Sequence, residues 1–129
     1  MRSSSRPQAE RECCEIEIAN TTRGSLLGGH IRVAGNALSR AIGLLGQTGL
    51  DPGGGLFIDP SSGIHTFGMR FPIDVIALDR RLQVRGLWEN LGSFRIAGLS
   101  WWTSCVLELP VGTIRASTTQ IGDQLQIRK

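Results

Sequence analysis

The chain has 129 residues, of which 40% are hydrophobic and 19% are charged, which is typical of a single globular domain. The single lysine is Lys129, and the two histidines lie far apart. This inventory excludes a phosphate-binding Gly-Lys-Ser/Thr loop, a Schiff-base lysine and a His-Glu-x-x-His zinc helix. The net charge of +3 comes from arginines scattered along the chain, a pattern that does not favour a nucleic-acid-binding surface.

Residues 1–12 are polar, and we expect them to form a flexible leader before a single domain at residues 13–129. No apolar segment typical of a signal peptide follows the basic start. No apolar run approaches the ~20 residues of a membrane-spanning helix. Cys13, Cys14 and Cys105 have neither disulfide nor metal-site spacing. These features predict a cytoplasmic protein with reduced thiols and without a cofactor or metal.

Alternation of apolar and polar residues, together with short apolar runs, predicts a series of short strands separated by turns. Eight strands are expected at residues 15–18, 30–33, 56–58, 73–78, 82–87, 94–96, 103–109 and 125–127. The mixed run at 64–69 adds a ninth if it enters the sheet. The clearest β-hairpin joins 73–78 to 82–87 through Asp79-Arg80-Arg81.

One helix is expected between Asn36, a good N-cap, and Gly46, which ends an apolar run of helical spacing. Residues 111–119 have room for one further helical turn. No repeated strand-helix pattern is present, so a parallel nucleotide-binding sheet is not expected. The prediction is a mainly-β fold, namely a compact single-domain barrel or sandwich of eight or nine short strands with one short helix packed on it.

Five ordered sequence blocks resemble those of a known family. They are Arg40-Ala41-Ile42-Gly43-Leu44-Leu45, Gly54-Gly55-Leu56-Phe57-Ile58, residues 65–75, Val106-Leu107-Glu108-Leu109-Pro110-Val111-Gly112 and Ile121-Gly122-Asp123. In this order they resemble the domain-of-unknown-function 192 family of prokaryotic proteins, over about residues 30–128. The resemblance implies a compact mainly-β fold with a packed helix, and no established reaction. Where many relatives have Met-Lys-Asn-Thr, this chain has Met69-Arg70-Phe71-Pro72.

The central block contains the first candidate site. If residues 64–69 lie beside 73–78, His65 and Asp74 approach each other, and the carboxylate would orient the imidazole as a general base. Alternatively, Asp74 accepts hydrogen bonds from the backbone of the bend at residues 71–72, and His65 caps a strand end. In either case an aspartate between apolar residues is half buried and needs a partner.

Glu108 alternates with Leu107 and Leu109, so it faces the other side of its strand. On an exposed face it is a surface charge, whereas inside a barrel it needs an arginine such as Arg40 or Arg70. If Asp74 and Glu108 face one cleft, they form a two-carboxylate hydrolytic site. Three ligands from separate strands, with His65 as the third, are an alternative but poor pattern for a metal site.

Trp101 and Trp102 are adjacent in a predicted loop, and an extended chain cannot bury both indoles. An exposed indole would mark a binding surface; alternatively, one indole packs in the core and the other covers its rim.

The favoured hypothesis is a non-enzymatic domain that binds a small polar ligand or a partner protein. The residues expected to carry this binding are His65, Met69, Arg70, Asp74, Trp101 and Trp102. One alternative is a small hydrolase or lyase that uses Asp74 and Glu108 with His65 as base. The other is an accessory protein in a larger assembly, and the sequence leaves the oligomeric state open.

Overall fold

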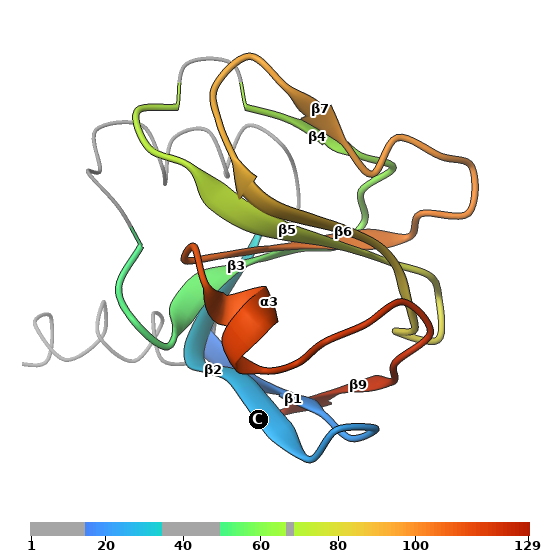
Figure 1. Ribbon diagram of the computed structural model, residues 1–129. Helices are drawn as coiled ribbons and strands as arrows, with labels where there is room; N and C mark the ends of the chain where they lie inside the picture. The colour runs from blue at the N-terminus through green and yellow to red at the C-terminus, as the bar shows by residue number, and fades with distance from the viewer. Residues whose placement is uncertain (1–14, 35–49, 67–68) are drawn as a thin grey trace, which may run out of the picture.

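The computed structural model describes residues 15–34, 50–66 and 69–129, apart from the side chain of His65. Over these residues it has nine strands and one short helix, so the predicted mainly-β fold is confirmed (Figure 1). The elements are β1 (Glu15–Asn20), β2 (Ser25–Ala34), β3 (Gly54–Ile58), β4 (Ile64–His65), β5 (Ile73–Leu78), β6 (Val84–Leu91), β7 (Ile96–Ala97), β8 (Cys105–Leu109), α3 (Thr113–Ala116) and β9 (Leu125–Arg128). The helix expected after Asn36 and the leader at 1–12 lie outside the described residues. Within the described ranges, no helix has the length and apolar character needed to cross a bilayer.

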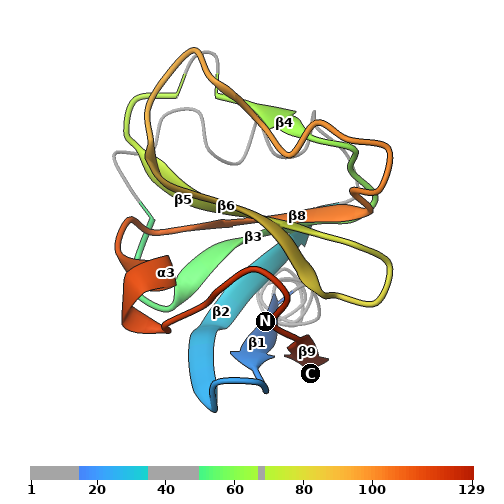
Figure 2. The ribbon, with the colours of Figure 1, turned by 45° about the vertical axis from the view of Figure 1, so that its right-hand side comes forward.

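Seven strands form one sheet in the order β6-β5-β8-β3-β2-β1-β9. All neighbours are antiparallel except β2 and β3, which run parallel. The sheet curls into a half-barrel (Figure 2). Its two ends meet at a bridge between Gln83 and Gln124, beside which the Leu125 amide donates to the Leu82 carbonyl at 2.9 Å. The curl therefore brings the first and last strands of the order together.

The predicted hairpin is confirmed, and β5 covers the residues expected of it. Its partner β6 starts at Val84, two residues later than expected, and continues to Leu91, four residues beyond the expected end at residue 87. The predicted helical turn after residue 111 is α3.

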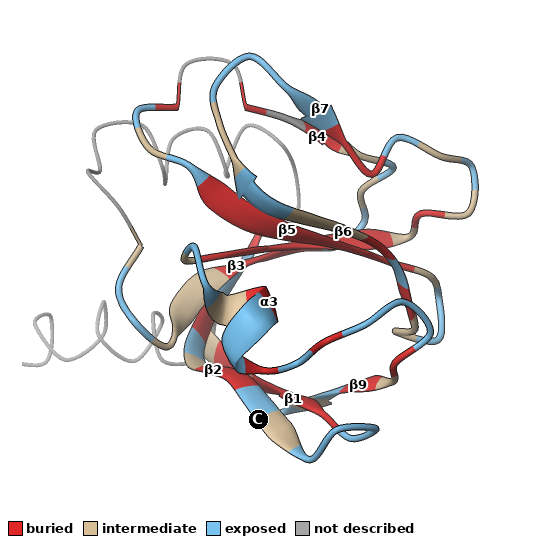
Figure 3. Cartoon of the chain, in the orientation of Figure 1, coloured by how far each residue is buried: buried red, intermediate tan, exposed pale blue. Residues whose placement is uncertain are grey.

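Two hydrophobic cores lie on opposite faces of the sheet, and β5 and β8, which lie between them, are buried along their whole length (Figure 3). The inner core fills the curl and includes Ile76, Leu107, Leu109 and Ile114 of α3. The outer core lies between the opposite face of the sheet and the small β4–β7 sheet. Its members from the large sheet and from the covering layer are Ala34, Leu56, Ile58, Ile64, Met69, Ile73, Val75, Ala97 and Val106. A polar side chain on β5 or β8 therefore belongs to one core or the other.

Candidate functional site

The expected pair of His65 and Asp74 requires β4 to lie beside β5, but β4 does not lie there. It pairs instead with β7, with Ile64 opposite Ala97 and His65 opposite Ile96. The neighbours of β5 in the large sheet are β6 and β8. The pairing of strands on which the general-base hypothesis depended is thus not formed.

Asp74 is fully buried and its carboxylate is held by backbone amides from two distant segments. Oδ1 accepts a hydrogen bond from the Asn90 amide at 2.9 Å, and Oδ2 accepts from the amides of Gly112 at 3.1 Å and Ile114 at 3.0 Å. Hydrogen bonds to a carboxylate are among the stronger ones in proteins. Asp74 therefore joins β5 to the end of β6 and to the first turn of α3. These donors replace the expected ones in the bend at 71–72.

Glu108 is also fully buried, but it lies on the other face of the sheet. Cross-strand partners share a face, and Glu108 is paired with Val75, a member of the outer core. Asp74 is paired with Leu109, a member of the inner core. The two carboxylates are therefore separated by the sheet, and the expected two-carboxylate cleft is not formed. Among the residues that the structure describes, no group of three His, Cys, Asp or Glu residues could hold a metal ion.

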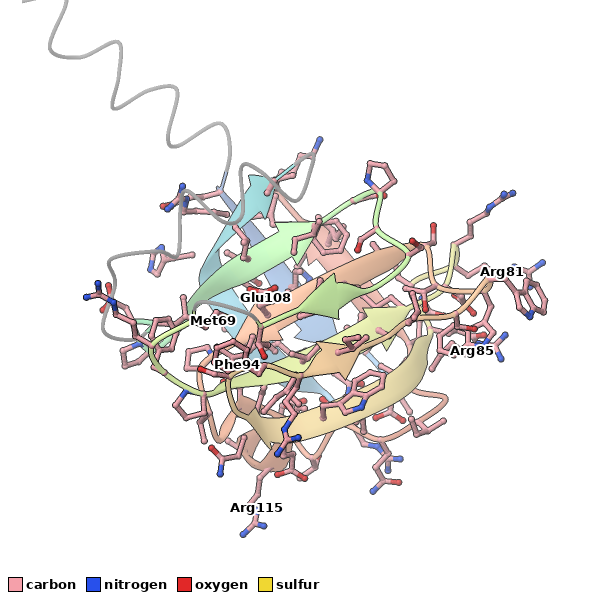
Figure 4. All side chains as sticks on the ribbon, turned by 90° about the horizontal axis from the view of Figure 1, so that it is seen from above. Met69, Arg81, Arg85, Phe94, Glu108 and Arg115 are labelled. Atoms are coloured by element: carbon pink, nitrogen blue, oxygen red, sulfur yellow. The ribbon has the colours of Figure 1, made fainter. Side chains whose placement is uncertain are left out.

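Of the expected binding residues in the central block, Met69 is buried in the outer core and Arg70 is exposed. Arg40, one of the arginines expected beside Glu108, lies outside the described residues. In Figure 4, Met69 and Glu108 lie far from the edge of the molecule that carries Arg81 and Arg85. The structure thus separates the central block from a second polar region at that edge.

This second region is a surface groove of about 420 Å³ that combines arginine and tryptophan side chains. We call it the Arg–Trp groove, and its lining residues are Asp79, Arg80, Arg81, Gln83, Arg85, Trp101, Trp102, Thr103 and Ser104. One wall is the turn between β5 and β6, and the other is the loop between β7 and β8. The two expected binding residues Trp101 and Trp102 therefore lie together, but with partners that the sequence hypothesis did not assign to them.

The register of the sheet explains this juxtaposition. Leu78, the last residue of β5, is opposite Cys105, the first residue of β8. When the last residue of one strand is opposite the first residue of its antiparallel partner, the residues that follow the first strand lie beside the residues that precede the second. The arginine-rich turn after Leu78 is thus placed beside the tryptophans before Cys105. The sequence carried both halves of this signal, but only the pairing of β5 with β8 brings them together.

Asp79 holds the turn of the groove in shape. Its Oδ1 accepts hydrogen bonds from the amides of Arg81 at 2.9 Å and Gln83 at 3.0 Å, and its Oδ2 accepts from Arg85 Nε at 2.9 Å. Burial alone would raise the pKa of the Asp79 carboxyl, but the Arg85 hydrogen bond and the two amides outweigh it and lower that pKa. The one carboxylate of the groove is thus neutralised by Arg85.

Arg80 and Arg81 are exposed. No ion pair between described residues involves either guanidinium. The groove therefore carries two positive charges that no carboxylate in the described part of the chain neutralises.

The opposite wall is a loop fixed by hydrogen bonds on both sides of the tryptophans. Thr103 Oγ1 donates to the Gly98 carbonyl at 2.6 Å, and the Ser104 amide donates to the Leu78 carbonyl at 2.8 Å. Trp101 at the tip is 94% exposed, whereas Trp102 is half-buried. Such exposure of the largest apolar side chain, on an anchored loop, is typical of a binding surface.

Cys105 borders this region but does not supply a nucleophile. Burial raises the pKa of its thiol to about 12, with smaller contributions from the charges of Asp59 and Asp79. Since the thiolate is the reactive form, the buried thiol is inert near neutral pH.

The model of the domain-of-unknown-function 192 family, described as "Uncharacterized ACR", matches residues 18–127 of the chain. No curated protein matches the chain. Two solved structures share the fold at 18% identity. One is of a proposed transcription regulator from Sinorhizobium meliloti 1021, with a TM-score of 0.68 over 88% of this chain and 92% of that one. The other is of a protein of unknown function from Novosphingobium aromaticivorans DSM 12444, with a TM-score of 0.69 over 87% of this chain and 83% of that one.

Proposed function

The chain belongs to the domain-of-unknown-function 192 family, and we propose that it is a binding domain whose Arg–Trp groove holds a small anionic ligand with a flat apolar part. The observation that carries the proposal is the 94% exposure of Trp101 beside two arginines that make no ion pair with a described residue. An exposed indole gains free energy when an apolar group covers it. A guanidinium without a carboxylate partner favours an anion.

The geometry of the groove supports binding over catalysis. Its lining contains no histidine, and its one carboxylate, Asp79, already accepts three hydrogen bonds. Ligand atoms in the groove would meet arginines, indoles and the polar side chains of Gln83, Thr103 and Ser104. These groups bind and orient a ligand, whereas a general base would need a free imidazole or carboxylate.

The proposal is tested with 1-anilinonaphthalene-8-sulfonate, a fluorescent probe that joins a sulfonate to flat rings. We expect the folded protein to bind it and Trp101→Ala to weaken binding about fivefold or more, since stacking on an aromatic side chain contributes about 1–3 kcal/mol. Arg80→Gln combined with Arg81→Gln should also weaken it.

The matched control for the arginine pair is Arg32→Gln combined with Arg115→Gln, two exposed arginines outside the groove. This control removes the same charge, so it should leave probe binding within about twofold of the parent if the groove is the site. Equal losses in both double variants would contradict the proposal, because they would reflect net charge alone.

A further inference from the structure

We infer that the Arg–Trp groove binds a nucleoside phosphate, with the base against Trp101 and the phosphate against Arg80 and Arg81. This inference rests on the proposed function and names the class of its ligand. It concerns the shared chemistry of a free nucleotide and of one unit in a single-stranded nucleic acid.

The side chains that line the groove favour a planar ring. Two indoles and three guanidinium groups are all flat, and they come from two facing walls. A nucleobase offers its whole face to such groups, and stacking on tryptophan or arginine is largely independent of which base is present. A sugar ring is puckered and would meet the same surfaces only through its C–H bonds.

The charges of the groove favour a phosphate. Arg80 and Arg81 are exposed and make no ion pair with a described residue. Their forked donors match the oxygens of a phosphate in pairs. Asp79, which would repel a phosphate, is bonded to Arg85 at 2.9 Å. The net field of the groove is therefore positive.

The arrangement in space removes the objection that the sequence raised against a nucleic-acid ligand. Arginines that are scattered along a chain argue against a basic patch only until the fold is known. Here Arg80, Arg81 and Arg85 meet Trp101 and Trp102 across one groove. The result is the combination of basic and aromatic side chains that proteins use for single strands.

The test compares three probes on the full chain by fluorescence anisotropy and calorimetry. They are adenosine 5′-monophosphate, a labelled oligomer of eight deoxythymidines and a heparin tetrasaccharide, whose charge is similar to that of the oligomer. If the oligomer binds more tightly than the nucleotide, the ligand is a single strand. If both bind equally, it is a free nucleotide. Either result supports the inference provided that Trp101→Ala weakens binding about fivefold or more.

The salt dependence of oligomer binding gives a second readout, which a purely apolar contact would not change. Two phosphate contacts predict a slope of log K against log salt steeper by about 1.4 in the parent than in the Arg80→Gln, Arg81→Gln variant. The Arg32→Gln, Arg115→Gln control should keep the parent slope. Thermal unfolding of each variant checks that it is folded.

Three results would overturn the inference. In the first, the anilinonaphthalene sulfonate binds in the groove but neither nucleotide probe does, and the proposed function then stands without its ligand class. In the second, no probe binds, and both the proposed function and the inference fail. Nucleotide binding that Trp101→Ala leaves unchanged would also overturn the inference, because the base would then lie elsewhere.

Discussion

The two ends of β5 carry aspartates with opposite surroundings. At its start, Asp74 is fully buried and accepts three backbone hydrogen bonds that join β5, β6 and α3. At its far end, Asp79 also accepts three hydrogen bonds, but the turn that it shapes exposes Arg80 and Arg81 next to Trp101. A carboxylate whose donors all come from the chain stabilises the fold. A surface with an uncovered indole and two cations that pair with no carboxylate in the described part of the chain is suited to a ligand.

The largest effect is expected at the Asp74 end. Asp74→Ala removes the acceptor of three backbone amides, those of Asn90, Gly112 and Ile114. We therefore expect the free energy of unfolding to fall by about 3–5 kcal/mol. Urea denaturation measures this loss. Asp74→Asn keeps one acceptor oxygen and should lose less. A loss below about 1 kcal/mol for the alanine variant would show that Asp74 does not hold these segments together.

The next effect comes from the close contact between β3 and β8. Gly55 has φ 153°, and a Cβ there would lie 2.5 Å from the Glu108 carbonyl oxygen. We expect Gly55→Ala to lower the free energy of unfolding by about 2–3 kcal/mol, since a backbone must move. Gly29→Ala is the matched control, because its Cβ meets nothing within 4 Å. Similar losses in the two variants would contradict the tight strand contact.

A smaller, pH-dependent effect is expected at the Asp79 end. The folded pKa of Asp79 lies below the ordinary value of 3.8, so its hydrogen bonds stabilise the fold fully at higher pH. That stabilisation is lost as the pH falls through the folded pKa. Asp79→Asn should therefore lower stability by about 1–2 kcal/mol near neutral pH.

The check is chemical denaturation of the parent and of Asp79→Asn at several pH values. The difference in the free energy of unfolding between the two proteins should stay constant above about pH 5 and narrow below pH 3.8. A gap that stays constant down to the lowest pH at which both proteins fold would contradict the assignment of the ionised carboxylate.

Alternating residues and short apolar runs predicted the strands well, because a half-buried strand has a period of two and a strand buried on both faces is apolar along most of its length. They could not predict which strands are neighbours. Asp74 and Glu108 look equivalent in the sequence, since each is a carboxylate within an apolar run. Their faces depend on the β5–β8 register, which places Asp74 opposite Leu109 and Glu108 opposite Val75. The hypothesis of a shared cleft failed at that step.

The Arg–Trp groove shows the same limit of the sequence, but here the fold forms a site that the sequence did not predict. The tryptophan pair and the arginine-rich turn were both visible, but about twenty residues separate them in the chain. Their meeting follows from Leu78 facing Cys105, a long-range contact that local pattern does not encode. The donors to Asp74 are backbone amides near the end of β6 and at the start of α3, and no residue type in the sequence signals them.

The most direct test of the contrast between the two ends of β5 measures stability and binding together in Trp101→Ala. Because this side chain is 94% exposed, we predict a change of less than about 0.5 kcal/mol in the free energy of unfolding. In the same samples, binding of anilinonaphthalene sulfonate should weaken about fivefold or more. A variant that binds the probe like the parent, or that loses several kcal/mol of stability, would contradict the assignment of this end to binding.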